Sequence, residues 1–251
     1  MTGGEHVIRL ADGEADVFLV HPQGAGPWPV VIFYMDAPGI RPELHRMATR
    51  LAEAGYCVVL PNLFYREGTG FRLPADCTDP ATPGHERMIG LYLDLPLPAV
   101  MADTERLLAW LDTQRAADAS RIGTLGYCMS GRFALVAAQR WPERVRAAAA
   151  IYGTGLVTEG ADSPHLLAAA APAATYTVFA ELDQHAPAAH AGPMREAFAA
   201  RGRVAEVEVL PGVDHGFGFP ERATYDEAAA EHVWRQIFAL FGTALGGRST
   251  P

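Results

Sequence analysis

Short apolar runs alternate along the chain with segments in which apolar residues recur every three or four positions. The runs predict buried strands and the three-to-four spacing predicts helices. The expected strands are residues 16–20 (at a sheet edge), 29–34, 56–61, 122–127, 147–152, 175–180 and 204–210. The expected helices are residues 43–54, 100–112, 133 to about 142, 191–201 and 223–245. This alternation predicts an α/β fold, a mostly parallel, doubly wound sheet with helices on both faces.

Two segments interrupt the alternation. Residues 62–98 contain recurrent Pro and Gly with scattered charges, and only residues 85–93 suggest a short helix. A stretch of this length without clear periodicity is usually functional or disordered, so we expect a variable lid or substrate region. Residues 153–172 are expected to form a loop. Because no repeat or linker divides the 251 residues, we predict one domain spanning residues 1–251.

Composition narrows the classes of function. The net charge of −9 provides no basic surface for nucleic acid, and no apolar run approaches the roughly 20 residues of a membrane span. The N-terminus lacks a signal-peptide pattern, and three unclustered cysteines favour a reducing compartment, so we expect a cytoplasmic protein. The expected partner is a small molecule, and the expected state is a monomer or small homo-oligomer.

All twenty basic residues are arginine. The absence of lysine excludes Schiff-base catalysis, a P-loop and a pyridoxal phosphate anchor. We expect no cofactor and no metal.

A strand-to-helix junction at Cys128 carries the strongest chemical signal. Gly126 precedes the cysteine by two residues, and Ser130 and Gly131 follow it. Small residues on both sides of a central one are typical of a nucleophile elbow, which presents that residue on a strained turn at a helix N-terminus. Such a position favours a thiolate and stabilises an oxyanion. The alternative is a buried structural cysteine on a glycine-rich turn.

Two further residues follow strands at the same predicted edge of the sheet. Asp183 and His215 complete the chain order nucleophile, acid, histidine that α/β-hydrolases use. Cys128 would attack a carbonyl, His215 would move the proton, and Asp183 would orient the imidazole. Asp183 could instead be a turn residue and His215 a structural histidine, and Asp214 is a second candidate for the acid. A metal site built from Asp183, His185, His190 and His215 lacks tight ligand spacing.

The chain resembles the dienelactone hydrolase family, the cysteine branch of the α/β-hydrolases, from residue 29 to the final helix. The segments that carry the resemblance are residues 126–131, 182–183 and 212–217, with Ser130 where the family has Gly. The resemblance implies that Asp36, in the place of a family Glu, modulates the thiol. It also implies that the backbone N–H groups of Ala37 and Met129 form the oxyanion hole.

The resemblance also implies residues that bind a substrate carboxylate. The family uses two arginines and a tyrosine, and Arg87, Tyr92 and Arg222 are the corresponding candidates here. Leu91 occupies the position one helical turn after Arg87, and Arg222 lies further beyond His215 than the family's arginine.

These observations predict a cysteine-dependent hydrolase of small lactones or carboxylic esters. One alternative is a thioesterase or general carboxylesterase with an apolar acyl pocket, which the apolar residues 91–97 favour. The other is a non-catalytic binding module in which the elbow persists and the thiol is inert.

Overall fold

The computed structural model describes residues 1–203 and 205–246. These residues form two compact units, which divide between Ala119 and Ser120. Each unit combines a sheet with packed helices, which confirms the predicted α/β class. The prediction of a single domain stays a prediction.

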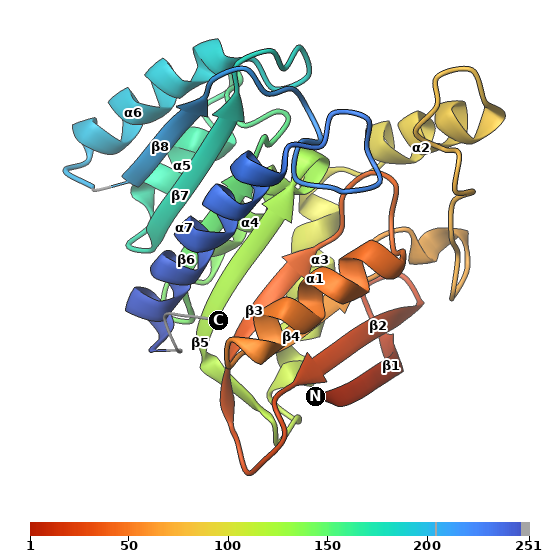
Figure 1. Ribbon diagram of the computed structural model, residues 1–251. Coiled ribbons are helices and arrows are strands. Elements are labelled where there is room, and N and C mark those ends of the chain that lie inside the picture. The colour runs from red at the N-terminus through yellow and green to blue at the C-terminus, as the bar shows by residue number, and fades with distance from the viewer. Residues whose placement is uncertain (204, 247–251) are drawn as a thin grey trace. The chain divides into compact units, whose positions relative to one another are not determined.

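The first unit carries strands in the order β1-β2-β4-β3 (Figure 1). β1 is antiparallel to β2, β2 is antiparallel to β4, and β4 is parallel to β3. The strands are β1 (Thr2–Arg9), β2 (Glu14–His21), β3 (Trp28–Tyr34) and β4 (Cys57–Pro61), and the helices are α1 (Pro42–Glu53), η1 (Tyr65–Glu67), α2 (Pro83–Leu93) and α3 (Leu97–Leu111).

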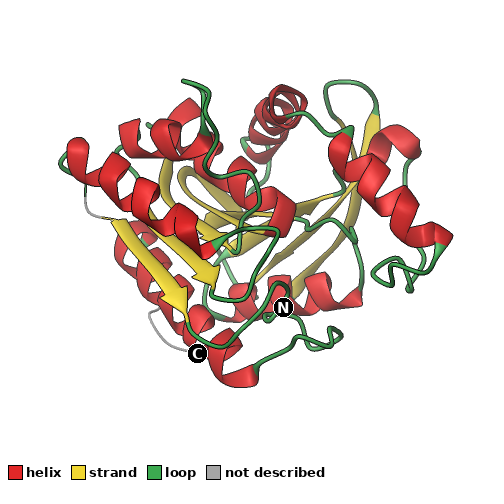
Figure 2. Ribbon diagram, turned by 90° about the horizontal axis from the view of Figure 1, so that it is seen from above, coloured by secondary structure: helices red, strands yellow, loops and turns green. Residues whose placement is uncertain are grey.

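The second unit is a parallel sheet in the order β5-β6-β7-β8. Its strands are β5 (Ala117–Tyr127), β6 (Val145–Ile151), β7 (Ala174–Ala180) and β8 (Ala205–Leu210); its helices are η2 (Cys128–Ser130), α4 (Gly131–Arg140), α5 (Pro164–Ala170), η3 (Ala188–His190), α6 (Ala191–Ala200) and α7 (Glu227–Leu245). Helices lie on both sides of the strands (Figure 2). Because the strands are parallel, their carboxyl ends lie along one edge.

Small residues allow α4 to approach β6 closely. Residues 147–150 of β6 are four alanines, all fully buried. A Cβ added to Gly131, the first residue of α4, would lie 2.8 Å from the Cα of Gly153 and 3.3 Å from the Cβ of Ala150. This packing places the N-terminus of α4 directly at the end of β6.

Two element predictions were wrong. Residues 16–20 belong to β2, which lies between β1 and β4 and is not an edge strand. The edge strand β1 escaped prediction because Gly3, Gly4, Glu5 and Arg9 leave it without a clear apolar pattern. The expected loop 153–172 contains the seven-residue helix α5, which is too short for periodicity to show.

Element ends differ where capping chemistry decides them. α7 begins at Glu227 and not at residue 223, because the Asp226 side chain accepts a hydrogen bond from the Ala229 N–H. Val204, predicted as the first residue of a strand, lies outside the described residues.

Buried carboxylates anchor the start of the variable region within the first unit. Asp103 accepts hydrogen bonds from the Tyr65 hydroxyl at 2.6 Å and from Arg66 Nη1 at 2.9 Å. Asp16 accepts from Asn62 Nδ2 at 2.9 Å and from the Gly70 N–H at 2.8 Å. Residues 62–72, the first part of the variable region 62–98, are therefore held against β2 and α3 by hydrogen bonds. The later part of the variable region includes α2.

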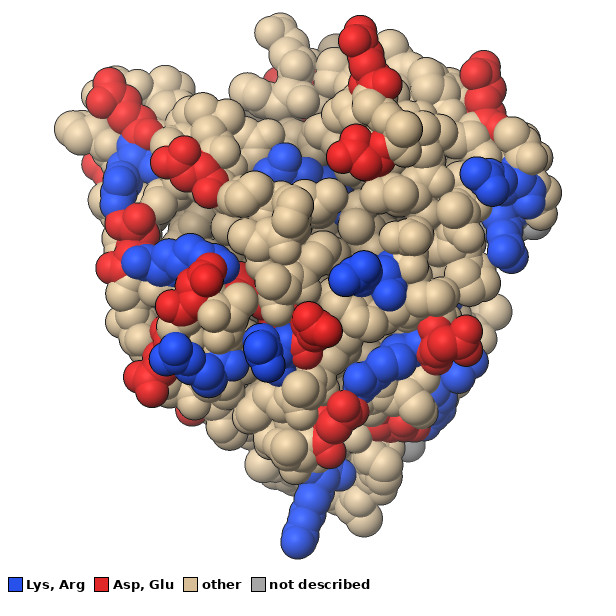
Figure 3. Space-filling model, turned by 180° about the vertical axis from the view of Figure 1, so that it is seen from behind, with Lys and Arg blue, Asp and Glu red and all other residues tan. Residues whose placement is uncertain are grey.

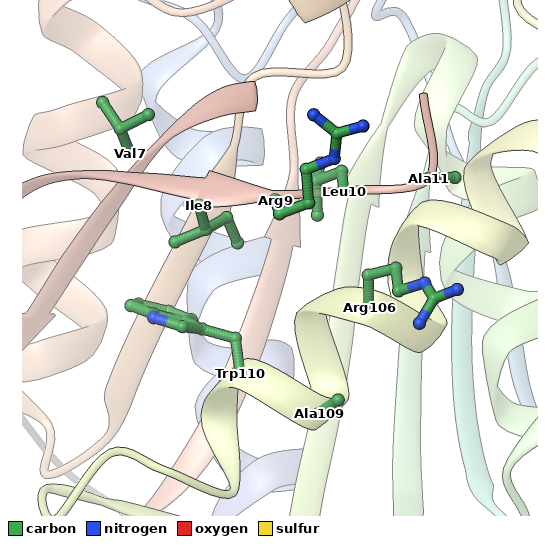
Figure 4. Close-up of a pocket in the computed structure, with 8 residues that line it drawn as sticks. All are labelled: Val7, Ile8, Arg9, Leu10, Ala11, Arg106, Ala109 and Trp110. Carbon is green, nitrogen blue, oxygen red and sulfur yellow. The ribbon is translucent and has the colours of Figure 1, made fainter. Parts of the chain in front are cut away.

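The first unit also has a pocket of about 770 Å³ between β1 and α3 (Figure 4). Its lining residues are Val7, Ile8, Arg9, Leu10, Ala11, Arg106, Ala109 and Trp110. None of the candidate catalytic residues lines it.

Acidic and basic side chains are interspersed on the face shown in Figure 3. Of the helices that the structure describes, none combines the length and the hydropathy that a membrane span requires.

Candidate active site

Cys128 occupies a strained turn between β5 and α4. Its φ of 55° is in the left-handed region. Among the described residues, Cys128 is one of two non-glycine residues with such a backbone. A Cβ added to Gly126 would collide with the Ser130 carbonyl oxygen, so only glycine fits there. Left-handed backbone at a non-glycine residue costs about 1–3 kcal/mol and persists only where the surroundings enforce it. The predicted elbow geometry is therefore present.

The turn is reinforced by hydrogen bonds to its backbone. The Ser130 hydroxyl donates to the Tyr127 carbonyl at 2.9 Å, and the Thr154 N–H donates to the Cys128 carbonyl at 3.0 Å. The Cys128 side chain is half-exposed, whereas Met129 is fully buried. Met129 lies in the first turn before α4, where backbone N–H groups have no intrahelical acceptor.

Asp183 and His215 meet at the ends of β7 and β8. His215 Nδ1 lies 2.7 Å from Asp183 Oδ2. The other carboxylate oxygen of Asp183 accepts from the N–H groups of His185 at 2.7 Å and Ala186 at 2.9 Å. These three contacts fix the Asp183 carboxylate in one orientation, and its side chain is fully buried.

The structure distinguishes the two candidate acids. Asp214 Oδ1 accepts the backbone N–H of His215 at 2.6 Å, so it caps the loop, and Asp183 is the carboxylate that contacts the imidazole. The Thr224 hydroxyl donates to the His215 carbonyl at 2.7 Å, which secures the loop from its other side.

The charges of this pair stabilise each other. Burial opposes a charge on His215, but its interactions with Asp183 and with the Cys128 side chain outweigh this effect and raise the pKa of the imidazole to about 10. Burial likewise opposes ionisation of Asp183, yet its hydrogen bonds to His215 and the two backbone N–H groups hold the carboxyl pKa below its usual range. The arrangement therefore favours an imidazolium beside a carboxylate.

Asp36 and Ala37 follow β3 in the first unit. Asp36 is buried and forms a bidentate ion pair with Arg41, in which Arg41 Nη2 donates to Asp36 Oδ2 at 3.0 Å. Arg41 Nη1 also donates to the Gly39 carbonyl at 3.1 Å. Sequence reasoning missed Arg41; its signal is a cation five residues after the carboxylate, across a glycine turn.

The three candidate ligands for a substrate carboxylate differ in setting. Arg87 is 54% exposed in its side chain and is ion-paired with Glu67. Tyr92 is half-exposed on α2. Arg222 is half-buried in the loop that carries His215, and the described residues provide it with no ion-pair partner. Its Cγ would lie 3.5 Å from a Cβ placed on Gly216, next to the histidine.

The sequence analysis gave no catalytic role to two residues whose rings contact His215. The ring of Tyr152 contacts His215 edge to face at 5.0 Å, and the ring of His185 contacts it at 5.1 Å. Tyr152 is the second non-glycine residue with left-handed backbone, φ 37°. Among the residues described, no three His, Cys, Asp or Glu are arranged to hold a metal ion.

Comparisons with known sequences assign the chain to a protein family. The sequence model of the dienelactone hydrolase family matches residues 15–245. A protein of Escherichia coli O157:H7, provisionally named a carboxymethylenebutenolidase, is 30% identical over 230 residues, which are 90% of this chain and 81% of that protein.

Solved structures agree with this placement. A protein of Klebsiella pneumoniae, described provisionally as a dienelactone hydrolase, aligns with a TM-score of 0.81 at 26% identity over 96% of this chain and 98% of that one. A dienelactone hydrolase-like promiscuous phosphotriesterase from metagenomic libraries shares the fold, with a TM-score of 0.78 at 18% identity over 97% and 98% of the two chains. These relatives confirm the predicted class of enzyme, a carboxylic ester hydrolase. The chain belongs to the dienelactone hydrolase family.

Proposed function

We propose that this protein hydrolyses small lactones and carboxylic esters with a Cys128–Asp183–His215 triad. The observation that carries the proposal is the 2.7 Å contact between His215 and the buried Asp183 carboxylate, within the unit whose elbow bears Cys128. A half-exposed thiol on such a turn is accessible to substrate, whereas Cys57 and Cys77 are buried. Burial also raises the pKa of the Cys57 thiol to about 12, which disfavours its reaction.

The chemistry proceeds in two half-reactions. The Cys128 thiolate attacks the carbonyl carbon, and the carbonyl π electrons move onto oxygen as the C–S bond forms. The C–O bond then breaks, and His215 gives its proton to the leaving alkoxide or enolate, which leaves an acyl thioester on Cys128. Water attacks the thioester while His215 takes its proton, and the thiolate departs.

Two backbone N–H groups are proposed to stabilise the oxyanion. Met129 supplies one, because its position in the turn before α4 leaves its N–H without an intrahelical acceptor. Ala37, after β3, is proposed to supply the other.

We propose a restricted role for Asp36. A carboxylate that already accepts two guanidinium hydrogen bonds from Arg41 is a poor acceptor for a thiol proton. We therefore assign proton transfer to His215 and retain for Asp36 only a modulating role.

Arg222 is the best-supported ligand for an acidic substrate. A half-buried guanidinium in the histidine loop, with no ion-pair partner among the described residues, suits a carboxylate on the substrate. Arg87 would have to exchange Glu67 for the substrate, and Tyr92 is proposed to assist it as a hydrogen-bond donor. The three cysteines are all free, which supports a cytoplasmic location.

The first prediction concerns the nucleophile and the substrate class. Release of product from a muconolactone-type dienelactone, p-nitrophenyl acetate and a longer acyl ester is measured for the wild type and Cys128→Ser. Turnover of the lactone and the acetate is expected to fall by a factor on the order of 10³ or more, because the hydroxyl is a weaker nucleophile than the thiolate. Cys57→Ser is the matched control, and retained turnover in Cys128→Ser contradicts the proposal.

The second prediction concerns pH. Asp183→Asn removes the charge that supports the imidazolium, so the pKa of His215 should fall from about 10 towards its ordinary value of 6.5. We expect kcat to drop on the order of 10³-fold or more. A raised histidine pKa stabilises the folded state fully below pH 6.5, and this contribution disappears as pH rises through about 10. Titration of the His215 ring by NMR measures the shift, and an unchanged pKa would refute the assigned contact.

The third prediction concerns Arg222. Arg222→Gln should raise KM about tenfold for an ester that carries a free carboxylate, since a charge-assisted hydrogen bond contributes about 1.5–3 kcal/mol. KM for p-nitrophenyl acetate should change little. Arg201→Gln, at an exposed arginine of the same unit, is the matched control. An equal effect on both substrates would show that Arg222 does not recognise the carboxylate.

A further inference from the structure

Tyr152 combines features that a merely space-filling tyrosine does not need. It follows β6 directly, has a φ of 37° and is fully buried. A bulky residue in left-handed backbone is strained, and such strain is typical of residues whose side chain must point in one fixed direction. The Tyr152 N–H donates to the Val178 carbonyl at 2.8 Å, which ties the strained backbone to β7.

That direction is towards the candidate catalytic histidine. The Tyr152 and His215 rings meet edge to face, with centroids 5.0 Å apart and planes at 62°. Phe217 contacts the Tyr152 ring at 5.0 Å and 67°, and Tyr127 contacts it at 5.6 Å and 67°. Tyr127 precedes Cys128, and Phe217 lies two residues after His215. Tyr152 therefore links the nucleophile elbow to the histidine loop.

The Tyr152 ring belongs to a buried aromatic cluster. Tyr127, Tyr152, Phe217 and Phe219 are each at most 2% exposed, and Tyr127 also contacts Phe219 at 5.3 Å. A Cβ added to Gly218 would lie 3.1 Å from the Tyr152 hydroxyl oxygen and 3.2 Å from Tyr127 Cε1. Glycine at 218 thus accommodates the tyrosine at full size.

We propose that Tyr152 is a positioning residue for His215: its strained backbone sets an aromatic ring against the imidazole and so fixes the imidazole relative to Cys128. The inference rests on the triad proposed above and assigns Tyr152 a part in it. Asp183 fixes the ring at Nδ1, and Tyr152 restricts its tilt from the buried side.

Tyr152→Leu and Tyr152→Phe separate this role from bulk packing. Leucine removes the aromatic ring, so kcat for p-nitrophenyl acetate should fall about tenfold or more, while KM stays within about twofold. Phenylalanine keeps the ring and should rescue kcat to within about threefold of the wild type. Tyr176→Leu is the control, because Tyr176 is an equally buried tyrosine on β7 whose hydroxyl donates to Glu208. The folded fraction of the Tyr176→Leu variant should keep the wild-type kcat.

The pH profile of kcat/KM provides a readout that a structural role would not move. Among the described residues of the second unit, the titratable groups that contact His215 are Asp183, Cys128, His185 and Tyr152 itself, and Asp214 accepts its backbone N–H. Of these groups only Tyr152 changes in the Tyr152 variants, and Tyr176→Leu changes none of them. The limb that reports His215 should shift in Tyr152→Leu and remain in place in Tyr176→Leu.

Gly218→Ala keeps the proposal testable if Tyr152→Leu does not fold. The added methyl group presses on the Tyr152 hydroxyl, so kcat should fall several-fold, and the loss should be smaller in a Tyr152→Phe background. Wild-type kcat and pH profile in folded Tyr152→Leu, or equal losses from Gly218→Ala in both backgrounds, would overturn the role of Tyr152. If Cys128→Ser instead retains turnover, the triad itself is wrong, so the two failures are distinguishable.

Discussion

The strained turn at Cys128 is the constraint on which the site depends. A left-handed backbone at a non-glycine residue raises the thiol above the end of β5, and the glycine at 126 is what allows Ser130 to pass close behind it. The energetic penalty of about 1–3 kcal/mol is met by packing of α4 against β6, where four consecutive alanines and Gly131 permit a close approach. The left-handed backbone at Cys128 thus depends on the small side chains packed beneath it.

The second strained residue, Tyr152, shows that the end of β6 is shaped in the same way. β5 ends in the elbow, β6 ends in Tyr152, β7 leads to Asp183, and β8 leads to the loop of His215. Each strand of the second unit therefore ends beside a residue of the proposed catalytic machinery. The parallel arrangement explains how residues far apart in the sequence, such as Asp183 and His215, come within 2.7 Å.

The sequence predicted this arrangement where local chemistry determines it. Apolar runs predicted the carboxyl ends of β5 to β7 to within one residue, although β5 begins five residues before the predicted strand, and glycine spacing predicted the elbow. The chain order of Asp183 and His215 after their strands predicted their pairing. Two glycines and two charged residues concealed β1, and α5 is too short to show a helical period. The ion pair of Asp36 with Arg41, the pairing of Arg87 with Glu67 and the contact of Tyr152 with His215 depend on side-chain placement that periodicity does not report.

The most direct test of the proposed mechanism is mass spectrometry of the acid-quenched reaction with p-nitrophenyl acetate during the first turnover, followed by peptide mapping. A thioester mechanism predicts one acetyl group per chain, on Cys128, formed together with the first equivalent of p-nitrophenol. Acetylation of a different residue, or release of p-nitrophenol with no acyl-enzyme at any quench time, would contradict the assignment of Cys128 as the nucleophile.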